Sequence, residues 1–172
     1  LLAGLDIDYR VTALPEVDES YPDTLSGEEI LLYISQEKAA AYRRFMKDNT
    51  LLITADTIVW LDGKVYGKPR DIADAKAMLQ ALSGKTHTVI TGVTLTSLQK
   101  QISFAVSTEV TFAALGDDEI DYYVETYRPL DKAGAYGVQE WIGYIGVTGL
   151  KGSYYNVMGL PIQRLYTELK KF

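Results

Sequence analysis

Two charged residues, Asp56 and Lys68, flank a short segment whose pattern could bring them close together. Asp56 comes just after the apolar run LLIT, which predicts a buried strand. Aspartate is depleted in strands, and its charge is costly inside a core. We therefore expect Asp56 to project from the C-terminal end of that strand, where open α/β sheets place ligands. The position also suits an ordinary turn or capping aspartate.

Lys68 lies between a glycine and a proline in the sequence YGKPR. Gly67 allows a sharp turn and Pro69 favours an extended conformation at Lys68, so the ammonium could bind a phosphate as a point charge. An Asp-Gly dipeptide at 62–63 predicts a hairpin turn between Asp56 and Lys68. Such a hairpin would bring the two charges near the ends of neighbouring strands. A solvated loop lysine is the alternative interpretation.

Other residues that could take part in chemistry also have ordinary structural interpretations. Glu19 lies in an acidic loop and Lys38 inside a predicted helix, and both positions are typical of solvated charges. The segment SGKT at 83–86 is similar to the end of a phosphate-binding P-loop. It is excluded because Leu79 occupies the place of the first glycine and a helix precedes the segment. His87 begins a predicted strand, where we expect a packed or hydrogen-bonded side chain and not a catalyst.

The composition narrows the possible chemistry. The 172 residues include no cysteine and one histidine, which excludes disulfides, thiol catalysis and thiolate metal sites and leaves carboxylates, lysines and backbone amides. The formal net charge of −6 would repel a nucleic-acid backbone, although local lysines could bind a small anion. No apolar run approaches the roughly 20 residues that span a bilayer. We expect a cytoplasmic protein whose natural N-terminus lies upstream of the helix tail at residues 1–5.

The order of predicted elements indicates a mixed α/β, or α+β, fold in a single domain over residues 1–172. Ser26 and Glu29 form a capping-box pattern, and Asp71 suits a helix N-cap. A glycine-rich stretch at 131–161 predicts loops and at least one strand, with Tyr154 and Tyr155 placed to contact a ligand. The predicted strands cover 7–15, 50–54, the hairpin 58–69, 86–98 and 101–115. The predicted helices cover 26–45, 71–84, 117–127 and 161–172.

Four motifs, taken together, resemble one known family. The segments ITADTIVWLDGKVYGKPRD, AMLQALSGKTHTVITGV, PLDKAGAYGVQ and GSYYNVMGLP resemble the Maf family in sequence and in order, and the resemblance runs over residues 1–172. Maf proteins were first described as septum-formation inhibitors and are now understood as nucleoside triphosphate pyrophosphatases. The sequences ADT and AYGVQ look like the branch that acts on dTTP and UTP. The branch that acts on 7-methyl-GTP carries a different residue after the aspartate.

Two departures from the family pattern concern the site. The family's N-terminal strand and Ser-x-Ser-Pro-Arg-Arg loop are absent from this sequence, so its phosphate- and base-contacting arginines cannot be assigned here. Glu140 stands where a glycine commonly follows the glutamine of the third motif. We therefore expect a local difference in the shape of that loop.

The resemblance implies a Maf/ITPase-like fold, with a central mixed sheet, flanking helices and two lobes around a cleft. It implies that Asp56 is the general base, and that Glu19 and Asp56 hold a divalent metal, Mg²⁺ or Mn²⁺. Lys38 and Lys68 would bind the triphosphate, whose nearly four negative charges must be neutralised before an anionic nucleophile approaches. Water would then attack the α-phosphorus and expel pyrophosphate.

The resemblance also implies how the base is chosen and which partners are involved. Thr57 and Gln139 would select thymine or uracil, so the substrates would be dTTP, UTP and modified pyrimidine nucleotides. The implied assembly is a homodimer, with no nucleic acid and no membrane as partner. A nucleotide-binding regulator of septum formation that does not turn over its ligand is the alternative function.

Overall fold

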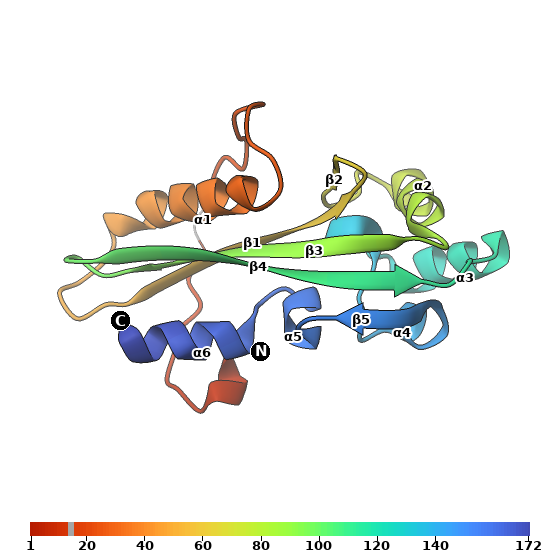
Figure 1. Ribbon diagram of the computed structural model, residues 1–172. Helices are drawn as coiled ribbons and strands as arrows, with labels where there is room; N and C mark the ends of the chain where they lie inside the picture. The colour runs from red at the N-terminus through yellow and green to blue at the C-terminus, as the bar shows by residue number, and fades with distance from the viewer. Residues whose placement is uncertain (14–15) are drawn as a thin grey trace.

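The fold is built on one five-stranded sheet, and the computed structural model describes residues 1–13 and 16–172 of the chain. The strands lie in the order β2-β1-β3-β4-β5 (Figure 1). Their bounds are β1 (Leu52–Leu61), β2 (Lys64–Tyr66), β3 (Thr86–Thr96), β4 (Gln101–Phe112) and β5 (Val147–Lys151). The α/β architecture with helices flanking a central sheet is confirmed.

Every strand pair in the described chain is antiparallel, whereas we expected a mixed sheet. β3 and β4 form one long hairpin, paired from Thr86↔Thr111 to Thr96↔Gln101. β1 and β2 form a second, short hairpin. Tight turns join antiparallel neighbours, while a parallel pair needs a crossover connection. Turns join β1 to β2 and β3 to β4. The longer segments 67–85 and 113–146 also lead into strands that pair antiparallel, so no pair among these strands is parallel.

The predicted turn at 62–63 is confirmed. Asp62 and Gly63 both have positive φ, 51° and 76°, as two-residue hairpin turns require. However, β1 is one continuous strand, so Asp56 lies in its middle, opposite Gly92, and not at its end as predicted. The alternation of side chains continues across Asp56 because β1 pairs with β3 from Leu52 to Trp60. β2 pairs with β1 only from Val59 onwards. Over 52–58 the described chain therefore leaves one edge of β1 without a strand neighbour.

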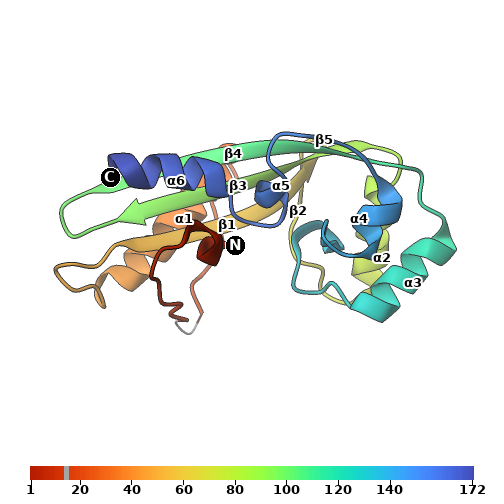
Figure 2. The same cartoon turned by 90° about the horizontal axis from the view of Figure 1, so that it is seen from below.

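Helices cover both faces of the long strands. α1 (Glu28–Arg43) packs on one face, where Leu31 meets Ile58 and Ile90. On the opposite face lie η1 (Leu2–Leu5), α5 (Tyr154–Val157) and α6 (Ile162–Lys171), and Leu165 packs on the sheet. Figures 1 and 2 show this arrangement, with α1 on one side of the sheet and α6 on the other.

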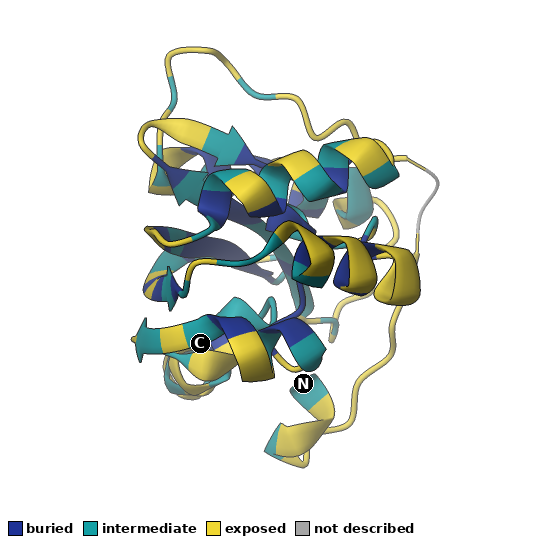
Figure 3. Cartoon of the chain, turned by 90° about the vertical axis from the view of Figure 1, so that its right-hand side faces the viewer, coloured by how far each residue is buried: buried dark blue, intermediate teal, exposed yellow. Residues whose placement is uncertain are grey.

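A second group of helices packs at the other end of the sheet. It contains α2 (Ile72–Leu82), α3 (Asp117–Tyr127), η2 (Ala133–Ala135) and α4 (Trp141–Gly146). The largest hydrophobic cluster lies here, between these helices and the ends of β1, β3 and β4. Figure 3 shows the buried residues on the inward sides of the elements and the exposed residues on their outward sides.

Several local predictions can be checked directly. Asp71 caps α2 by accepting a hydrogen bond from the Asp74 backbone N–H at 2.7 Å, as predicted. The N-cap of α1 is Gly27 in place of Ser26, although the Ser26 N–H still donates to Glu29.

The predicted strand over 7–15 is wrong for residues 7–13. These residues form no regular structure and are exposed, so nothing buries a strand's apolar face there. Residues 14 and 15 lie outside the described residues. No helix in the described parts of the chain is both long and apolar enough to cross a membrane.

Candidate active site

A cavity of about 260 Å³ lies beside the free edge of β1. Its wall is formed by β1, the loop after β2, the segment 131–139 and the turn after α5. Four of the predicted residues line it: Asp56, Thr57, Lys68 and Gln139. Two others lie beside it: Lys38 contacts Asp56, and Glu19 contacts Lys38. The structure thus gathers all six predicted residues around one cavity.

Lys38 joins the two predicted metal-binding carboxylates. Its Nζ lies 2.9 Å from Glu19 Oε1, 3.4 Å from Asp56 Oδ1 and 3.5 Å from the Ala55 carbonyl oxygen. The three side chains come from a loop, from α1 and from β1. α1 is fixed to β1 nearby, because Thr54 donates a 2.7 Å hydrogen bond to the Ser35 carbonyl.

The environment of this cluster shifts two pKa values. Burial raises the pKa of Asp56 above the ordinary value of an aspartic acid; Lys38 opposes that shift only in part, and the Glu19 carboxylate adds to it. Burial by itself would lower the pKa of Lys38, but Asp56 and Glu19 together raise it. Lys38 therefore stays charged, while Asp56 becomes a stronger base than a free aspartate.

Thr57 faces the opposite side of the sheet from Asp56, because successive residues of a strand alternate. Its hydroxyl lies 2.8 Å from the Thr91 hydroxyl and 3.4 Å from the Gly159 carbonyl oxygen. Both Asp56 and Thr57 still line the cavity, since the cavity wraps around the free edge of β1. The two faces of one strand thereby serve one site.

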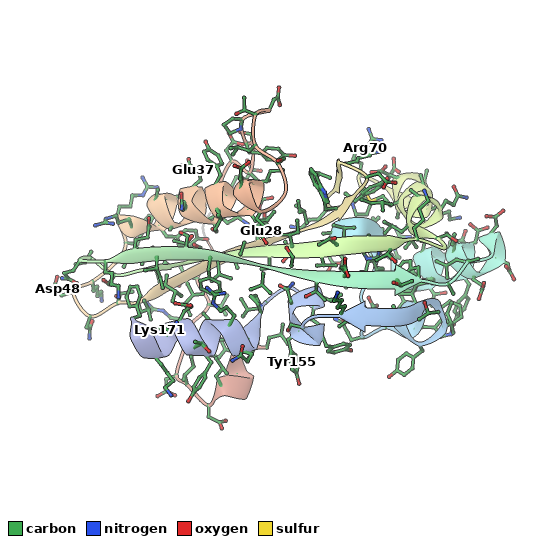
Figure 4. All side chains as sticks on the ribbon, in the orientation of Figure 1. Glu28, Glu37, Asp48, Arg70, Tyr155 and Lys171 are labelled. Carbon is green, nitrogen blue, oxygen red and sulfur yellow. The ribbon has the colours of Figure 1, made fainter. Side chains whose placement is uncertain are left out.

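Lys68 is exposed in the loop that joins β2 to α2. Among the described residues, no carboxylate lies within ion-pair distance of its ammonium. The loop is held in place by a 3.1 Å hydrogen bond from the Gly134 N–H to the Gly67 carbonyl. Two residues further on, Arg70 lies at the outer surface on the α1 side of the sheet (Figure 4).

Sequence reasoning missed a second paired lysine in the cavity wall. Lys132 Nζ lies 3.1 Å from Asp131 Oδ1 and 3.5 Å from Glu140 Oε1. Tyr123 donates to Glu140 Oε1 at 3.1 Å and accepts a 3.0 Å hydrogen bond from the Gly137 N–H. The adjacent Asp131 and Lys132, directly before AGAYGVQ, could have indicated a charged site in the sequence. Nothing in the sequence indicated that Tyr123 takes part, because it comes from α3.

His87 is buried and packed, as predicted. Its Nε2 lies 2.6 Å from the Tyr136 hydroxyl, and its ring meets those of Phe112 and Tyr136 edge-on. Burial lowers the pKa of His87 to about 4. Tyr154 and Tyr155, in contrast, are exposed and do not line the cavity; the residues just after them, 157–159, do.

The carboxylates of Glu19 and Asp56 fit an oxygen-binding cation. They converge on one point, where the Lys38 ammonium lies between them. The described residues contain no cluster of three or more histidine, aspartate or glutamate side chains suited to a metal. Mg²⁺ commonly takes one or two protein carboxylates and completes its shell with substrate phosphates and water. Two carboxylates beside the cavity are compatible with that kind of site.

The whole chain is similar to known proteins. Residues 1–172 match the family model described as "Maf-like protein". The chain is 66% identical over 171 residues to a dTTP/UTP pyrophosphatase of Phocaeicola vulgatus, covering 99% of this chain and 89% of that protein. It is 62% identical to the dTTP/UTP pyrophosphatase of Bacteroides thetaiotaomicron with the same coverage. It is 48% identical over 166 residues to that of Flavobacterium psychrophilum, covering 96% and 85%.

Proposed function

This chain belongs to the Maf family, and we propose that it hydrolyses dTTP and UTP to the nucleoside monophosphate and pyrophosphate. The observation that carries the proposal is the cluster of Asp56, Lys38 and Glu19 beside the cavity. It occurs in a chain 48–66% identical to dTTP/UTP pyrophosphatases over nearly its full length. Modified pyrimidine nucleotides are a further substrate class compatible with the same site.

The charges around the cavity support a need for an added cation. Three lysines, Lys38, Lys68 and Lys132, lie in or beside it. Four carboxylates accompany them, those of Glu19, Asp56, Asp131 and Glu140. This set is net negative before a triphosphate with nearly four negative charges arrives. Glu19 and Asp56 would hold Mg²⁺ or Mn²⁺, which neutralises phosphate charge when it is bound.

Asp56 is the proposed general base. Its carboxylate would orient a water molecule and accept its proton as the water oxygen bonds to the α-phosphorus. The bond from that phosphorus to the bridging oxygen then breaks, and pyrophosphate leaves with the electron pair. Burial raises the pKa of Asp56, which strengthens its carboxylate as a base. Lys38 keeps Asp56 in place, and the unpaired ammonium of Lys68 is available to the phosphates.

Thr57 and Gln139 are the proposed base-selecting residues. Thymine and uracil each present an N3–H donor flanked by carbonyl acceptors. The Gln139 amide can donate and accept, so it could bind the N3–H and one carbonyl together. Gln139 is exposed in the cavity wall, where such an edge is accessible. We further propose a cytoplasmic homodimer without nucleic acid or membrane as partner, in keeping with the net charge of −6 and the absence of cysteine.

A pyrophosphate-release assay across the nucleoside triphosphates tests the proposed activity. We expect turnover of UTP and dTTP well above that of CTP, ATP and GTP, with the monophosphate as the second product. Release of orthophosphate would contradict the proposed bond cleavage. Tight binding of UTP with no turnover would favour a regulatory nucleotide-binding protein instead.

Chelation tests the metal. In excess chelator we expect turnover to be lost, because the net negative site cannot neutralise the triphosphate unaided. Re-addition of Mg²⁺ or Mn²⁺ should restore the rate, with Zn²⁺ less effective at a site of oxygen ligands. Undiminished turnover in chelator would contradict the assignment of Glu19 and Asp56 as metal ligands.

A further inference from the structure

Lys132 is held at the cavity by two carboxylates that differ in exposure. Asp131 Oδ1 lies 3.1 Å from its ammonium and the Asp131 side chain is 78% exposed. Glu140 Oε1 lies 3.5 Å away and the Glu140 side chain is 20% exposed. An ion pair with an exposed acid contributes little to stability and exchanges easily with solvent. Lys132 can therefore release Asp131 at small cost, while Glu140 remains close to it.

Glu140 is held in place by its neighbours in the fold. Glu140 accepts a hydrogen bond from Tyr123, whose own side chain is fully buried in α3. A side chain at Gly137 would collide with Glu140 Oε1 and lie 3.0 Å from Lys132 Cε. Glycine at 137 thus lets Lys132 and Glu140 lie across the loop that leads to Gln139. The position of the Lys132 ammonium is fixed by packing that involves three segments.

Lys132 also has a second lysine as its neighbour. The pKa of Asp131 is lowered chiefly by the hydrogen bond from Lys132, and the charge of Lys68 contributes to the same shift. Asp131 therefore lies near both lysines, and all three residues line the cavity. Lys132 is paired with this one exposed carboxylate, and Lys68 has no ion-pair partner among the described residues. Two neighbouring ammonium groups with so little competing charge suit a phosphate chain, which offers several anionic oxygens to charge-assisted hydrogen bonds.

We propose that Lys132 is a further substrate-binding residue, which binds the triphosphate together with Lys68, and that Glu140 restrains its ammonium until the phosphates arrive. The proposal rests on the proposed function, because that function supplies the triphosphate. On binding, the phosphates replace Asp131 as the partner of Lys132. Glu140, which stays 3.5 Å from it, then competes with the phosphates for the same ammonium. Removing Lys132 should weaken phosphate binding, and removing the charge of Glu140 should strengthen it.

The chain offers a matched control lysine outside the cavity. Lys76 Nζ lies 3.0 Å from Asp121 Oδ1 and 2.8 Å from Glu125 Oε1, so it too is held by two carboxylates. Its side chain is 25% exposed, against 29% for Lys132. Lys76 joins α2 to α3 and does not line the cavity. Any effect of losing a doubly paired lysine as such should appear equally at Lys76.

The test measures binding of inorganic tripolyphosphate with Mg²⁺ by calorimetry, which needs no turnover, together with KM for UTP. For Lys132→Met we expect both the Kd and the KM to rise about tenfold or more, the usual effect of losing a hydrogen bond to a charged group. Lys76→Met should change neither, and Lys132→Arg should retain most of the affinity. Equal effects of Lys132→Met and Lys76→Met, or wild-type protein that binds no tripolyphosphate, would overturn the proposal.

Glu140→Gln provides a test of opposite sign. We expect tripolyphosphate to bind about two- to fivefold more tightly, as loss of one screened ion pair predicts, while Glu125→Gln leaves binding unchanged. Weakened binding in Glu140→Gln would contradict the restraining role. If Lys132→Met weakened binding of uridine and not of tripolyphosphate, Lys132 would contact the base and the proposal would fail. If wild-type protein bound tripolyphosphate through Lys132 yet hydrolysed no UTP, the proposed function would fail and this inference would stand.

Discussion

The two ends of the cavity are built in different ways. At the Asp56 end, three charged side chains meet, and one of them, Glu19, is half exposed in a loop without regular structure. At the Gln139 end, the ion pairs of Lys132 accompany a backbone that packing and buried hydrogen bonds hold in place. Tyr123 and Tyr136 are buried there, and the Tyr136 hydroxyl is bonded to His87.

This difference indicates a division of work between the ends. The Glu19 carboxylate, half exposed in a loop, can rearrange when a metal and phosphates arrive, because an ion pair with an exposed acid costs little to break. A packed network resists such movement, because every buried polar group that loses its partner costs free energy. We therefore expect changes at the Asp56 end to alter rate, and changes at the Gln139 end to alter stability and choice of base.

Asp56→Asn should give the largest effect. Asparagine has nearly the same shape as aspartate, but it can neither accept the proton from water nor carry charge. We expect kcat to fall by about two to four orders of magnitude, the usual range for a lost general base. Thermal unfolding should show the variant folded, since burial already disfavours the charged carboxylate. A near-normal kcat would contradict the role of Asp56 as general base and would make Glu19 the next candidate. Changes at the Asp56 end would then not be the ones that control the rate.

Protonation of His87, at the Gln139 end of the cavity, should make the free energy of unfolding depend on pH. The pKa of His87 is about 4 in the folded protein and 6.5 in an ordinary environment. Below pH 6.5 His87 becomes protonated in the unfolded chain, whereas in the folded protein it becomes protonated only near pH 4. Stability should fall over that window by on the order of 3 kcal/mol from this residue.

Denaturant unfolding of wild type and His87→Gln at pH 7 and pH 4.5 checks this. The variant should lose less stability between the two values, because its amide does not titrate. Tyr136→Phe serves as the control, since it keeps His87 buried and should keep the wild-type pH dependence. The same pH dependence in wild type and His87→Gln would show that His87 is not the titrating group.

Gln139→Leu should give the smallest effect, and one confined to the choice of base. A polar edge of the bound pyrimidine would lose its partner, at a cost of about 1–3 kcal/mol. The measurement is kcat/KM for UTP, dTTP, CTP and GTP in both proteins. We expect the loss for UTP and dTTP to exceed that for GTP. Equal losses on all four nucleotides would mean that Gln139 shapes the loop without reading the base.

The sequence by itself determined the local features of this protein. The turn at Asp62-Gly63, the cap at Asp71 and the long strands of the β3–β4 hairpin all followed from residue types within a few positions of each other. So did the family, because its motifs are short and keep their order. Local patterns could not show that Asp56 lies in mid-strand, since that follows from the pairing of β1 with β3, a strand further along the chain.

Only the tertiary structure decided which charges meet. Lys38 lies 17 residues from Ala55, and Thr57 contacts a carbonyl 102 residues away. Lys132 and Glu140 are close in sequence, yet their geometry depends on Tyr123 from α3. The predicted strand at 7–15 failed at residues 7–13 for a related reason, because a strand needs a neighbour and a face to bury, and these residues have neither in the described chain. Periodicity and turn chemistry act over a few residues, whereas a site is made where distant segments are forced together by a shared core.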